Sequence, residues 1–213
     1  MAYENEEKKL HDALVSCKVP DIKKAVDEAH AAGMPATEII DALGNAMSEV
    51  GVLFERGKLF LPHVLSAANG MKAAMELLGP EMAAAAGGEK AAAAVVMGTV
   101  EGDVHDIGKS ICSTMLQCAG FEVHDLGRDV PKQKFVDEVK GGCTFCGMSA
   151  LMTTTMTVQK DVIEMMKSAG LRDKVTIMVG GAPVTQAYAD KIGADLYGES
   201  ASETTRKAKE LLA

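Results

Sequence analysis

One short segment of the chain places a histidine between acidic side chains at a spacing that suits metal coordination. It reads EGDVHDIGKS, with Asp103 two residues before His105 and Asp106 one residue after it. One ring nitrogen of a loop histidine can bind a metal while a carboxylate accepts the other N–H, which fixes the tautomer. We expect His105 to be the ligand and Asp103 its partner. A helix start capped by aspartate is the alternative for this segment.

The same segment lacks the glycine spacing of nucleotide-binding loops. It contains no GxxxxGK[ST], and Gly102 and Gly108 do not give the GxGxxG spacing. A nicotinamide-binding function therefore loses its main support.

Two further short motifs follow later in the chain, each directly after a predicted buried strand. They are Ser149-Ala150-Leu151 and Gly180-Gly181. The carboxyl ends of parallel strands meet at one edge of a sheet, so these loops should lie beside the His105 segment. Helix capping is the alternative for Ser149 and the threonines after it, and a tight strand-to-helix turn is the alternative for the glycines.

Together these motifs resemble the signature of cobalamin-binding domains. That signature is DxHxxG, then SxL, then GG, and here residues 109–148 and 152–179 separate the three parts. The resemblance implies that His105 replaces the benzimidazole of the corrinoid as the lower ligand of cobalt, the base-off/His-on state. It further implies that Asp103 tunes the proton of His105 and that Thr155 relays this proton to solvent.

The resemblance also implies a pocket for the displaced nucleotide tail of the corrinoid. Ser149 and Thr153 resemble residues that hold the tail near its benzimidazole, and the two glycines would let it pass close to the backbone. The cofactor-binding residues predicted in this half of the chain are Asp103, His105, Ile107, Gly108, Ser149, Leu151, Thr153, Thr155, Gly180 and Gly181.

The N-terminal part resembles the helical cap domain of methionine synthase and of methyltransferase corrinoid proteins. The resemblance rests on VGVLFERG at 50–57, Phe60-Leu61-Pro62, Ala67-Ala68 and Met71-Lys72. It implies that Phe60 and Leu61 cover the upper face of the corrin.

A chain with only these two parts is similar to corrinoid methyl carriers. The resemblance implies a carrier that is not catalytic alone, since no catalytic barrel is present. It would take a methyl group from a substrate methyltransferase, with a methylamine as the donor, and pass it to a second methyltransferase acting on a thiol such as coenzyme M, as in methanogenesis. A reductive activase would be a third partner. The alternatives are a corrinoid-dependent sensor, the cobalamin-binding subunit of a mutase and a flavodoxin-like protein with another ligand.

The hydrophobic pattern predicts the elements that position these motifs. Helical spacing predicts four helices at about 4–17, 20–32, 35–56 and 61–78, which together imply a small bundle. We expect a cap domain at 1–80, a linker at 81–90 and a corrinoid-binding domain at 91–213.

After the linker, strand and helix patterns alternate. Five such units predict a flavodoxin/Rossmann-like parallel sheet with helices on both faces. The expected strands are 93–100, 121–123, 145–149, 175–179 and 194–196, and the expected helices are 107–119, 131–140, 154–169, 182–192 and 200–212.

Composition narrows the class of protein. The net charge is −8, aromatic residues make up 4% and Trp is absent, which argues against a nucleic-acid partner. No apolar run approaches the roughly 18 residues of a membrane span, so we expect no membrane partner. The N-terminus lacks the apolar core of a signal peptide, which favours a cytoplasmic location and five reduced cysteines.

Cys143 and Cys146 form a CxxC motif whose role as a redox or metal pair is weakly supported. Strand alternation would place the two thiols on opposite faces, and no histidine is near in the sequence. His124 lacks the setting of a loop with neighbouring acids, so neither it nor the cysteines enter the predicted site.

Overall fold

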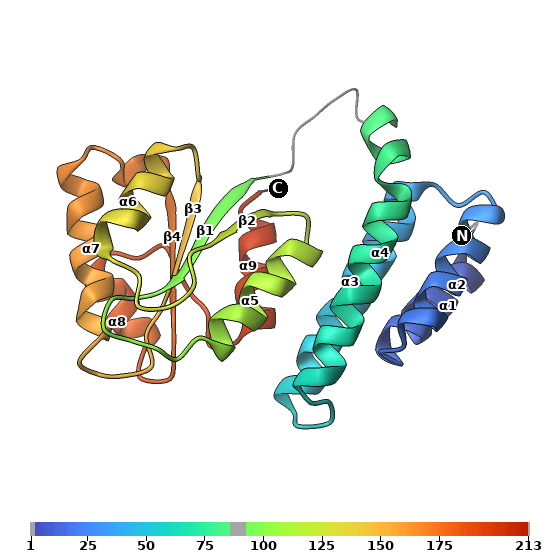
Figure 1. The fold of residues 1–213 in the computed structure, drawn as a ribbon, viewed down its shortest axis with the longest axis horizontal. Coiled ribbons are helices and arrows are strands. Elements are labelled where there is room, and N and C mark those ends of the chain that lie inside the picture. Colours follow the sequence, from blue (N-terminus) through green and yellow to red (C-terminus); the bar gives the residue numbers. More distant parts are fainter. Residues whose placement is uncertain (1–2, 86–92, 213) are drawn as a thin grey trace. The chain divides into compact units, whose positions relative to one another are not determined.

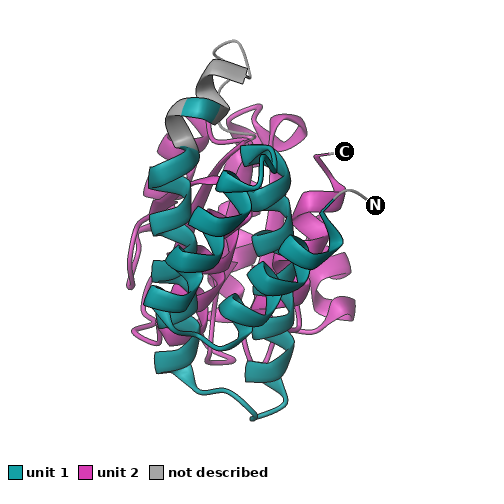
Figure 2. Ribbon diagram, turned by 90° about the vertical axis from the view of Figure 1, so that its right-hand side faces the viewer, with its two compact units in different colours: residues 1–90 teal, residues 91–213 magenta. Residues whose placement is uncertain are grey.

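The structure, a computed structural model, describes residues 3–85 and 93–212. The chain divides into two compact units, Met1–Lys90 and Ala91–Ala213 (Figure 2). The first consists of helices and the second of a sheet with helices, as the alternation pattern predicted.

Unit 1 is a bundle of four helices: α1 (Glu4–Val15), α2 (Val19–Ala31), α3 (Ala36–Glu55) and α4 (Leu61–Ala85). Pro20 lies in the first turn of α2, where its missing N–H costs no hydrogen bond. Gly33 follows α2 and Gly57 follows α3, both with positive φ, which stops each helix. Apolar side chains at helical spacing fill the bundle; the largest are Leu10, Leu14, Ile22, Ile39, Leu43 and Met71.

Helix α4 is longer than the sequence pattern predicted. Gly79-Pro80 was expected to end it near Leu78, but the helix continues to Ala85. Alanine is the strongest helix former, and the run from Ala83 onwards favours continuation past the proline. Residues 81–85 of the expected linker are therefore helical, and its remainder, residues 86–90, lies outside the described residues.

Unit 2 holds a five-stranded, all-parallel sheet in the order β2-β1-β3-β4-β5. The strands are β1 (Ala94–Thr99), β2 (Glu122–Asp125), β3 (Phe145–Ser149), β4 (Thr176–Gly180) and β5 (Leu196–Tyr197). The helices are α5 (Ile107–Cys118), α6 (Lys132–Lys140), α7 (Met156–Ser168), α8 (Gln186–Ile192) and α9 (Ala201–Glu210), with a 3-10 turn η1 (Arg172–Lys174) (Figure 1). Helix α8 begins four residues later than predicted and β5 two residues later.

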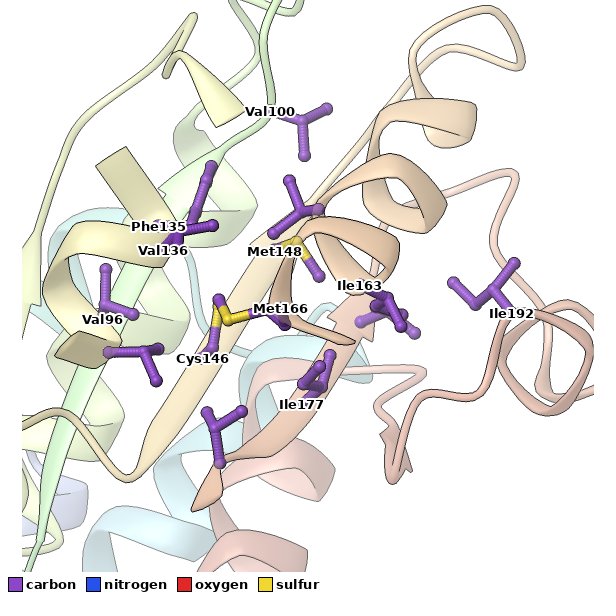
Figure 3. Close-up of a cluster of buried hydrophobic side chains, with 14 of the residues drawn as sticks. Val96, Val100, Phe135, Val136, Cys146, Met148, Ile163, Met166, Ile177 and Ile192 are labelled. Carbon is purple, nitrogen blue, oxygen red and sulfur yellow. The ribbon is translucent and has the colours of Figure 1, made fainter. Parts of the chain in front are cut away.

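Alternate residues of the strands face two separate cores, so both faces of the sheet are covered. Val96, Cys146 and Ile177 pack with α6, α7 and α8, in the cluster that Figure 3 shows. Val95, Phe145 and Met178 pack on the other face, where α5 and α9 supply Leu116 and Ala208. None of the helices in the described part of the chain combines the length and apolarity needed to cross a bilayer.

The strand order creates a switch point between β1 and β3. From β1 the chain crosses to β2 on one side, and from β3 it crosses to β4 on the other. Ligands of open α/β sheets bind in the crevice beyond the carboxyl ends at such a point. The loops after β1 and β3, which carry His105 and Ser149, lie there.

Candidate functional site

The carboxylate of Asp103 is the centre of the hydrogen-bond network in this crevice. Its side chain is fully buried and accepts four hydrogen bonds. Oδ1 accepts from the backbone N of His105 at 3.0 Å and faces the ring Nδ1 at 2.8 Å. Oδ2 accepts from the backbone N of Leu151 at 2.7 Å and from the hydroxyl of Thr155 at 2.7 Å. One buried carboxylate thus joins the loop after β1 to the loop after β3.

These contacts keep Asp103 ionised. Burial alone raises the pKa of its carboxyl, but the donors of His105, Leu151 and Thr155 outweigh burial and hold the pKa well below its ordinary value. Four donors stabilise the negative charge, and none of them could bond as well to a protonated acid.

The ionised carboxylate also sets the tautomer of His105. An acceptor-only group at Nδ1 requires that nitrogen to carry the proton, which leaves the lone pair of a neutral ring on Nε2. The side chain of His105 is 48% exposed, and Nε2 has no hydrogen-bond partner in the described ranges 3–85 and 93–212. The predicted pairing of His105 with Asp103 is present, and the free nitrogen is the one able to bind a metal.

The loop that carries His105 is held by its own backbone and by the loop after β2. Gly102 adopts φ 83°, a conformation that favours glycine, and its N–H donates to Oδ1 of Asp129 at 2.7 Å. The hydroxyl of Thr99 donates to the carbonyl of His105 at 3.2 Å. The histidine is therefore fixed on both its backbone and its ring.

Thr155 bonds to Asp103 rather than capping a helix. It occupies the position before α7, yet its side chain makes no capping hydrogen bond there. Its hydroxyl lies 2.7 Å from Oδ2 of Asp103 and 3.0 Å from the carbonyl of Met152, and it has one proton for the two acceptors. The capping alternative is wrong for this threonine, whose proton can move between the two oxygens by rotation.

The remaining residues of the predicted tail pocket lie on the loop after β3. Ser149 is the last residue of β3 and is half-buried, whereas Leu151 and Thr153 are exposed. Leu151 was predicted to bind the cofactor, and its backbone N–H is also one of the donors to Asp103. The sequence gives no sign of this contact, because every residue other than proline has a backbone N–H.

The three predicted glycines differ in how much space a side chain would have at their positions. A Cβ on Gly181 would collide with the carbonyl of Ala150, and its φ is 124°. A Cβ on Gly180 would lie 3.2 Å from the carbonyl of Gly198. A Cβ on Gly108 would meet no atom within 4 Å. The clash with Ala150 explains why residue 181 is a glycine. No such clash exists at Gly108, where open space lies beside the first turn of α5.

Phe60 and Leu61, the predicted cap residues, belong to unit 1. Phe60 is 63% exposed, and its backbone N–H donates to Nδ1 of His63 at 3.1 Å. An exposed phenylalanine is available for contact with a ligand or a second surface.

Two buried polar residues that support the site were not predicted. Lys109 is buried on α5 and pairs with Asp125 at the end of β2 at 2.5 Å. Gln159 on α7 donates to the carbonyls of Met148 and Gly180 at 3.0 and 3.2 Å, and so joins the carboxyl ends of β3 and β4. Its position inside a helix gives no sign of this role in the sequence.

Both parts of this chain match family models that are described as a B12 binding domain. Residues 93–206 match a B12 binding domain, and residues 6–78 match a second model with the same description. A dimethylamine corrinoid protein of Methanosarcina acetivorans is 58% identical over 203 residues, 94% of each chain. A trimethylamine corrinoid protein of the same organism is 50% identical over 206 residues, 96% of this chain and 95% of the other. The chain belongs to the B12-binding family of corrinoid proteins.

Two solved structures match this chain along nearly its whole length. A cobalamin-binding protein from Desulfitobacterium hafniense has a TM-score of 0.82 at 31% identity, covering 96% of this chain and 97% of that one. A methanol:cobalamin methyltransferase complex from Methanosarcina barkeri has a TM-score of 0.78 at 31% identity, covering 98% of this chain and 80% of that one. The predicted fold class is confirmed.

The residues around His105 fit a corrinoid. Nε2 is the donor atom that a cobalt ion needs, and the space beside Gly108 lets a large ring approach α5. Four large apolar side chains near the histidine are exposed, as expected for a surface that a macrocycle covers; they are Val104, Ile107, Leu151 and Met152.

Proposed function

We propose that this chain is a corrinoid-bound methyl carrier of a methylamine-dependent methyltransferase system. It would accept a methyl group from a substrate methyltransferase, with dimethylamine as the donor, and deliver it to a second methyltransferase that acts on a thiol such as coenzyme M. The observation that carries the proposal is the buried Asp103–His105 pair with a free Nε2, in a chain matched along 94% of its length by a dimethylamine corrinoid protein.

In this proposal His105 supplies the lower ligand of cobalt through Nε2, the base-off/His-on arrangement. The bound corrinoid supplies the chemistry, a cobalt centre that takes up and releases the methyl group. Asp103 keeps the proton on Nδ1 and holds the ring in place. Thr155, which donates to the other oxygen of Asp103, is the group through which that proton would be relayed to solvent. The low pKa of Asp103 supports this role, because the carboxylate remains an acceptor at neutral pH.

The nucleotide tail of the corrinoid would run between the loops after β3 and β4. Ser149 and Thr153 provide hydroxyl groups on one side, and Gly180 and Gly181 provide bare backbone on the other. Gln159 holds the two strand ends together and so positions both walls of this pocket.

We assign residues 1–80 as a cap and residues 91–213 as the corrinoid-binding domain; residues 81–85, expected in the linker, continue helix α4. Phe60 and Leu61 would shield the upper face of the corrin between encounters with partner enzymes, and a reductive activase would restore the cofactor after oxidation. The five free cysteines support a reducing, cytoplasmic location.

Two alternatives, a corrinoid-dependent sensor and a mutase subunit, receive less support. A relative whose name specifies a dimethylamine corrinoid protein covers both units of this chain. A structure that includes a methyltransferase also covers both units, and a carrier needs such an enzyme as its partner.

The test is electron paramagnetic resonance of the protein loaded with corrinoid and containing Co(II). Isotopic labelling of imidazole nitrogen should change the hyperfine pattern, and His105→Ala should remove this change. Asp103→Asn should keep the coupling but lower corrinoid affinity or methyl transfer about 10–100-fold, as for other partners of metal-bound histidines. Coupling that persists in His105→Ala would assign the ligand to another residue and contradict the proposal.

The donor is tested separately by methyl transfer from dimethylamine, trimethylamine and monomethylamine with their respective methyltransferases. The proposal expects transfer to be fastest with the dimethylamine enzyme. Equal or faster transfer with another methylamine would contradict the choice of donor while leaving the carrier role in place.

A further inference from the structure

A second group of possible metal ligands lies away from the loops that carry the corrinoid motifs. It consists of His124 on β2, Glu138 on the last turns of α6 and Cys143 in the turn between α6 and β3. Nδ1 of His124 lies 2.7 Å from Oε2 of Glu138 and 3.6 Å from Sγ of Cys143, and Sγ lies 4.0 Å from the same Oε2. One nitrogen, one oxygen and one sulfur therefore form a closed triangle.

The sheet register and the turn before β3 bring these residues together. Val96 of β1 pairs with His124 on one side and with Cys146 on the other, so both side chains face α6. The backbone N of Cys143 donates to the carbonyl of Glu138 at 3.1 Å, which folds the cysteine back over the end of the helix.

The expectation that strand alternation separates Cys143 from Cys146 is wrong. Cys143 precedes the first residue of β3, so strand alternation does not apply to it. Both cysteines belong to the same buried cluster, in which Figure 3 labels Cys146. His124 lies on β2 rather than in a loop, but Glu138 and Glu122 both flank its ring.

The triangle is close to the size that a tetrahedral ion requires. Zinc bonds of about 2.0 Å to nitrogen and oxygen and about 2.3 Å to sulfur place neighbouring ligand atoms roughly 3.3–3.6 Å apart. The separation of nitrogen and sulfur already has this value. The Glu138 oxygen is too close to the nitrogen, at 2.7 Å, and too far from the sulfur, at 4.0 Å, so ion binding would require this side chain to move.

The other ring nitrogen of His124 also has the partner that a metal-bound histidine needs. Nε2 lies 3.4 Å from Oε1 of Glu122, so Nδ1 can bind an ion while Nε2 donates its proton to a carboxylate. Cys143 is buried, but the side chains of His124 and Glu138 are partly exposed and give an ion a path to the site.

We propose that His124, Glu138 and Cys143 form a binding site for a divalent cation of the zinc class. A set of nitrogen, oxygen and sulfur donors suits zinc, whereas magnesium and calcium require oxygen ligands. Burial, together with the negative charge of Glu138 and Glu122, raises the pKa of the Cys143 thiol to about 11. Binding at neutral pH would form a metal–sulfur bond and release the thiol proton to solvent.

The position of the site indicates a structural role. It joins the edge strand β2, the last turns of α6 and the turn that precedes β3, on the face of the sheet that α6 covers. The motif loops lie beyond the carboxyl ends of the strands, so an ion here would stabilise unit 2 without touching His105. The alternative is a plain ion pair between His124 and Glu138, with Cys143 as a buried thiol.

The test is calorimetric titration of the corrinoid-free full-length chain with ZnCl2. We expect one zinc ion per chain and a zinc-dependent rise in melting temperature. Cys143→Ser and Glu138→Gln should each weaken binding at least about tenfold, and Glu122→Gln should weaken it by about 10–100-fold. With Cd2+, an ultraviolet thiolate charge-transfer band should appear in the wild type and be absent from Cys143→Ser.

Matched variants separate this site from general binding by histidines and thiols. His11 contacts two carboxylates, Glu49 at 2.8 Å and Asp12 at 3.3 Å, and neither of these contacts involves a cysteine. His11→Gln, Cys118→Ser and His105→Gln should therefore bind zinc as the wild type does. Circular dichroism of each variant checks its fold.

Three results would overturn the proposal. The first is that the wild type does not bind zinc stoichiometrically. The second is that folded Cys143→Ser and Glu138→Gln bind zinc as tightly as the wild type does. The third is that His11→Gln loses as much zinc affinity as these two variants do. None of these results bears on the corrinoid function, which is tested by the coupling to His105.

Discussion

The hydroxyl of Thr155 donates a 2.7 Å hydrogen bond to the buried carboxylate of Asp103, across 52 positions of sequence. This bond ties the start of α7 to the loop that carries His105. It also leaves the ring of His105 and the hydroxyl of Thr155 on different oxygens of one carboxylate. Substituting Asp103 or Thr155 should therefore change the position or the protonation of the His105 ring.

Thr155→Val should test this network with little change in shape. A hydrogen bond to a charged group contributes about 1.5–3 kcal/mol, so the free energy of unfolding should fall by about that amount. Corrinoid affinity should fall with it, and Thr155→Ser, which restores the hydroxyl, should recover most of both. Urea unfolding and corrinoid titration measure the two effects, and equal behaviour of the valine and serine variants would contradict the role of the hydroxyl.

Gly181 and Gly108 should respond differently to alanine. Gly181→Ala should destabilise unit 2 by several kcal/mol, because its Cβ meets the carbonyl of Ala150 at a positive φ. Gly108→Ala should leave the corrinoid-free fold unchanged or more stable by up to about 1 kcal/mol, since nothing lies within 4 Å and alanine favours a helix.

The same Gly108→Ala variant should nevertheless bind corrinoid more weakly if the cofactor uses the open space. Thermal unfolding without corrinoid and titration with it separate the two effects. Unchanged corrinoid affinity would show that the space beside Gly108 is not used.

Gln159→Met should loosen the carboxyl ends of β3 and β4. The amide donates to two buried carbonyls, and its own Oε1 has no hydrogen-bond partner in the described part of the chain. Losing these bonds should lower the free energy of unfolding by about 1–3 kcal/mol. Corrinoid affinity should fall further than stability explains, whereas Ser168→Ala at the other end of α7 should affect neither.

Phe60→Ala in the full-length chain tests the cap assignment. Phe60 is 63% exposed, so its removal should cost little stability. If it shields the corrin, the reduced cofactor should be oxidised faster by air than in the wild type, as stopped-flow absorbance would show. Leu77→Ala, at a 54% exposed position of α4 in the same unit, is the matched control and should oxidise at the wild-type rate. Equal rates in all three proteins would contradict the cap assignment for Phe60.

Glu203 should make the stability of α9 depend on pH. Ser200 caps this helix by accepting a hydrogen bond from the backbone N of Glu203 at 3.2 Å. The backbone N–H of Glu199 and the charge of Lys207 lower the pKa of Glu203. A lowered pKa adds stability above the unfolded value of about 4.3 and loses it as the pH falls.

Glu203→Gln should therefore be less stable than the wild type at pH 7, and the difference should shrink below about pH 4. Urea unfolding at several pH values measures this difference. A difference that is independent of pH would show that the charge of Glu203 contributes nothing.

The sequence by itself determined the order of elements and the placement of the main motifs. Period-two and period-3.6 patterns are local properties, so β3 and the start of α5 were predicted to the residue. The spacing of Asp103, His105 and Gly108 lies within one loop, and the pairing of Asp103 with His105 needs only two residues of separation. The end of α4 and the start of α8 were missed, because proline and glycine signals there compete with helix-forming neighbours.

Only the tertiary structure decided which distant groups meet. Parallel strands bring their carboxyl ends together whatever the chain length between them, so the amide of Leu151 and the amide group of Gln159 reach the site without any local signal. The same register places His124 beside Cys143, nineteen positions apart, because both lie on the face of the sheet that α6 covers. Contacts across strands depend on register and packing, and neither is encoded in the spacing of residues along the chain.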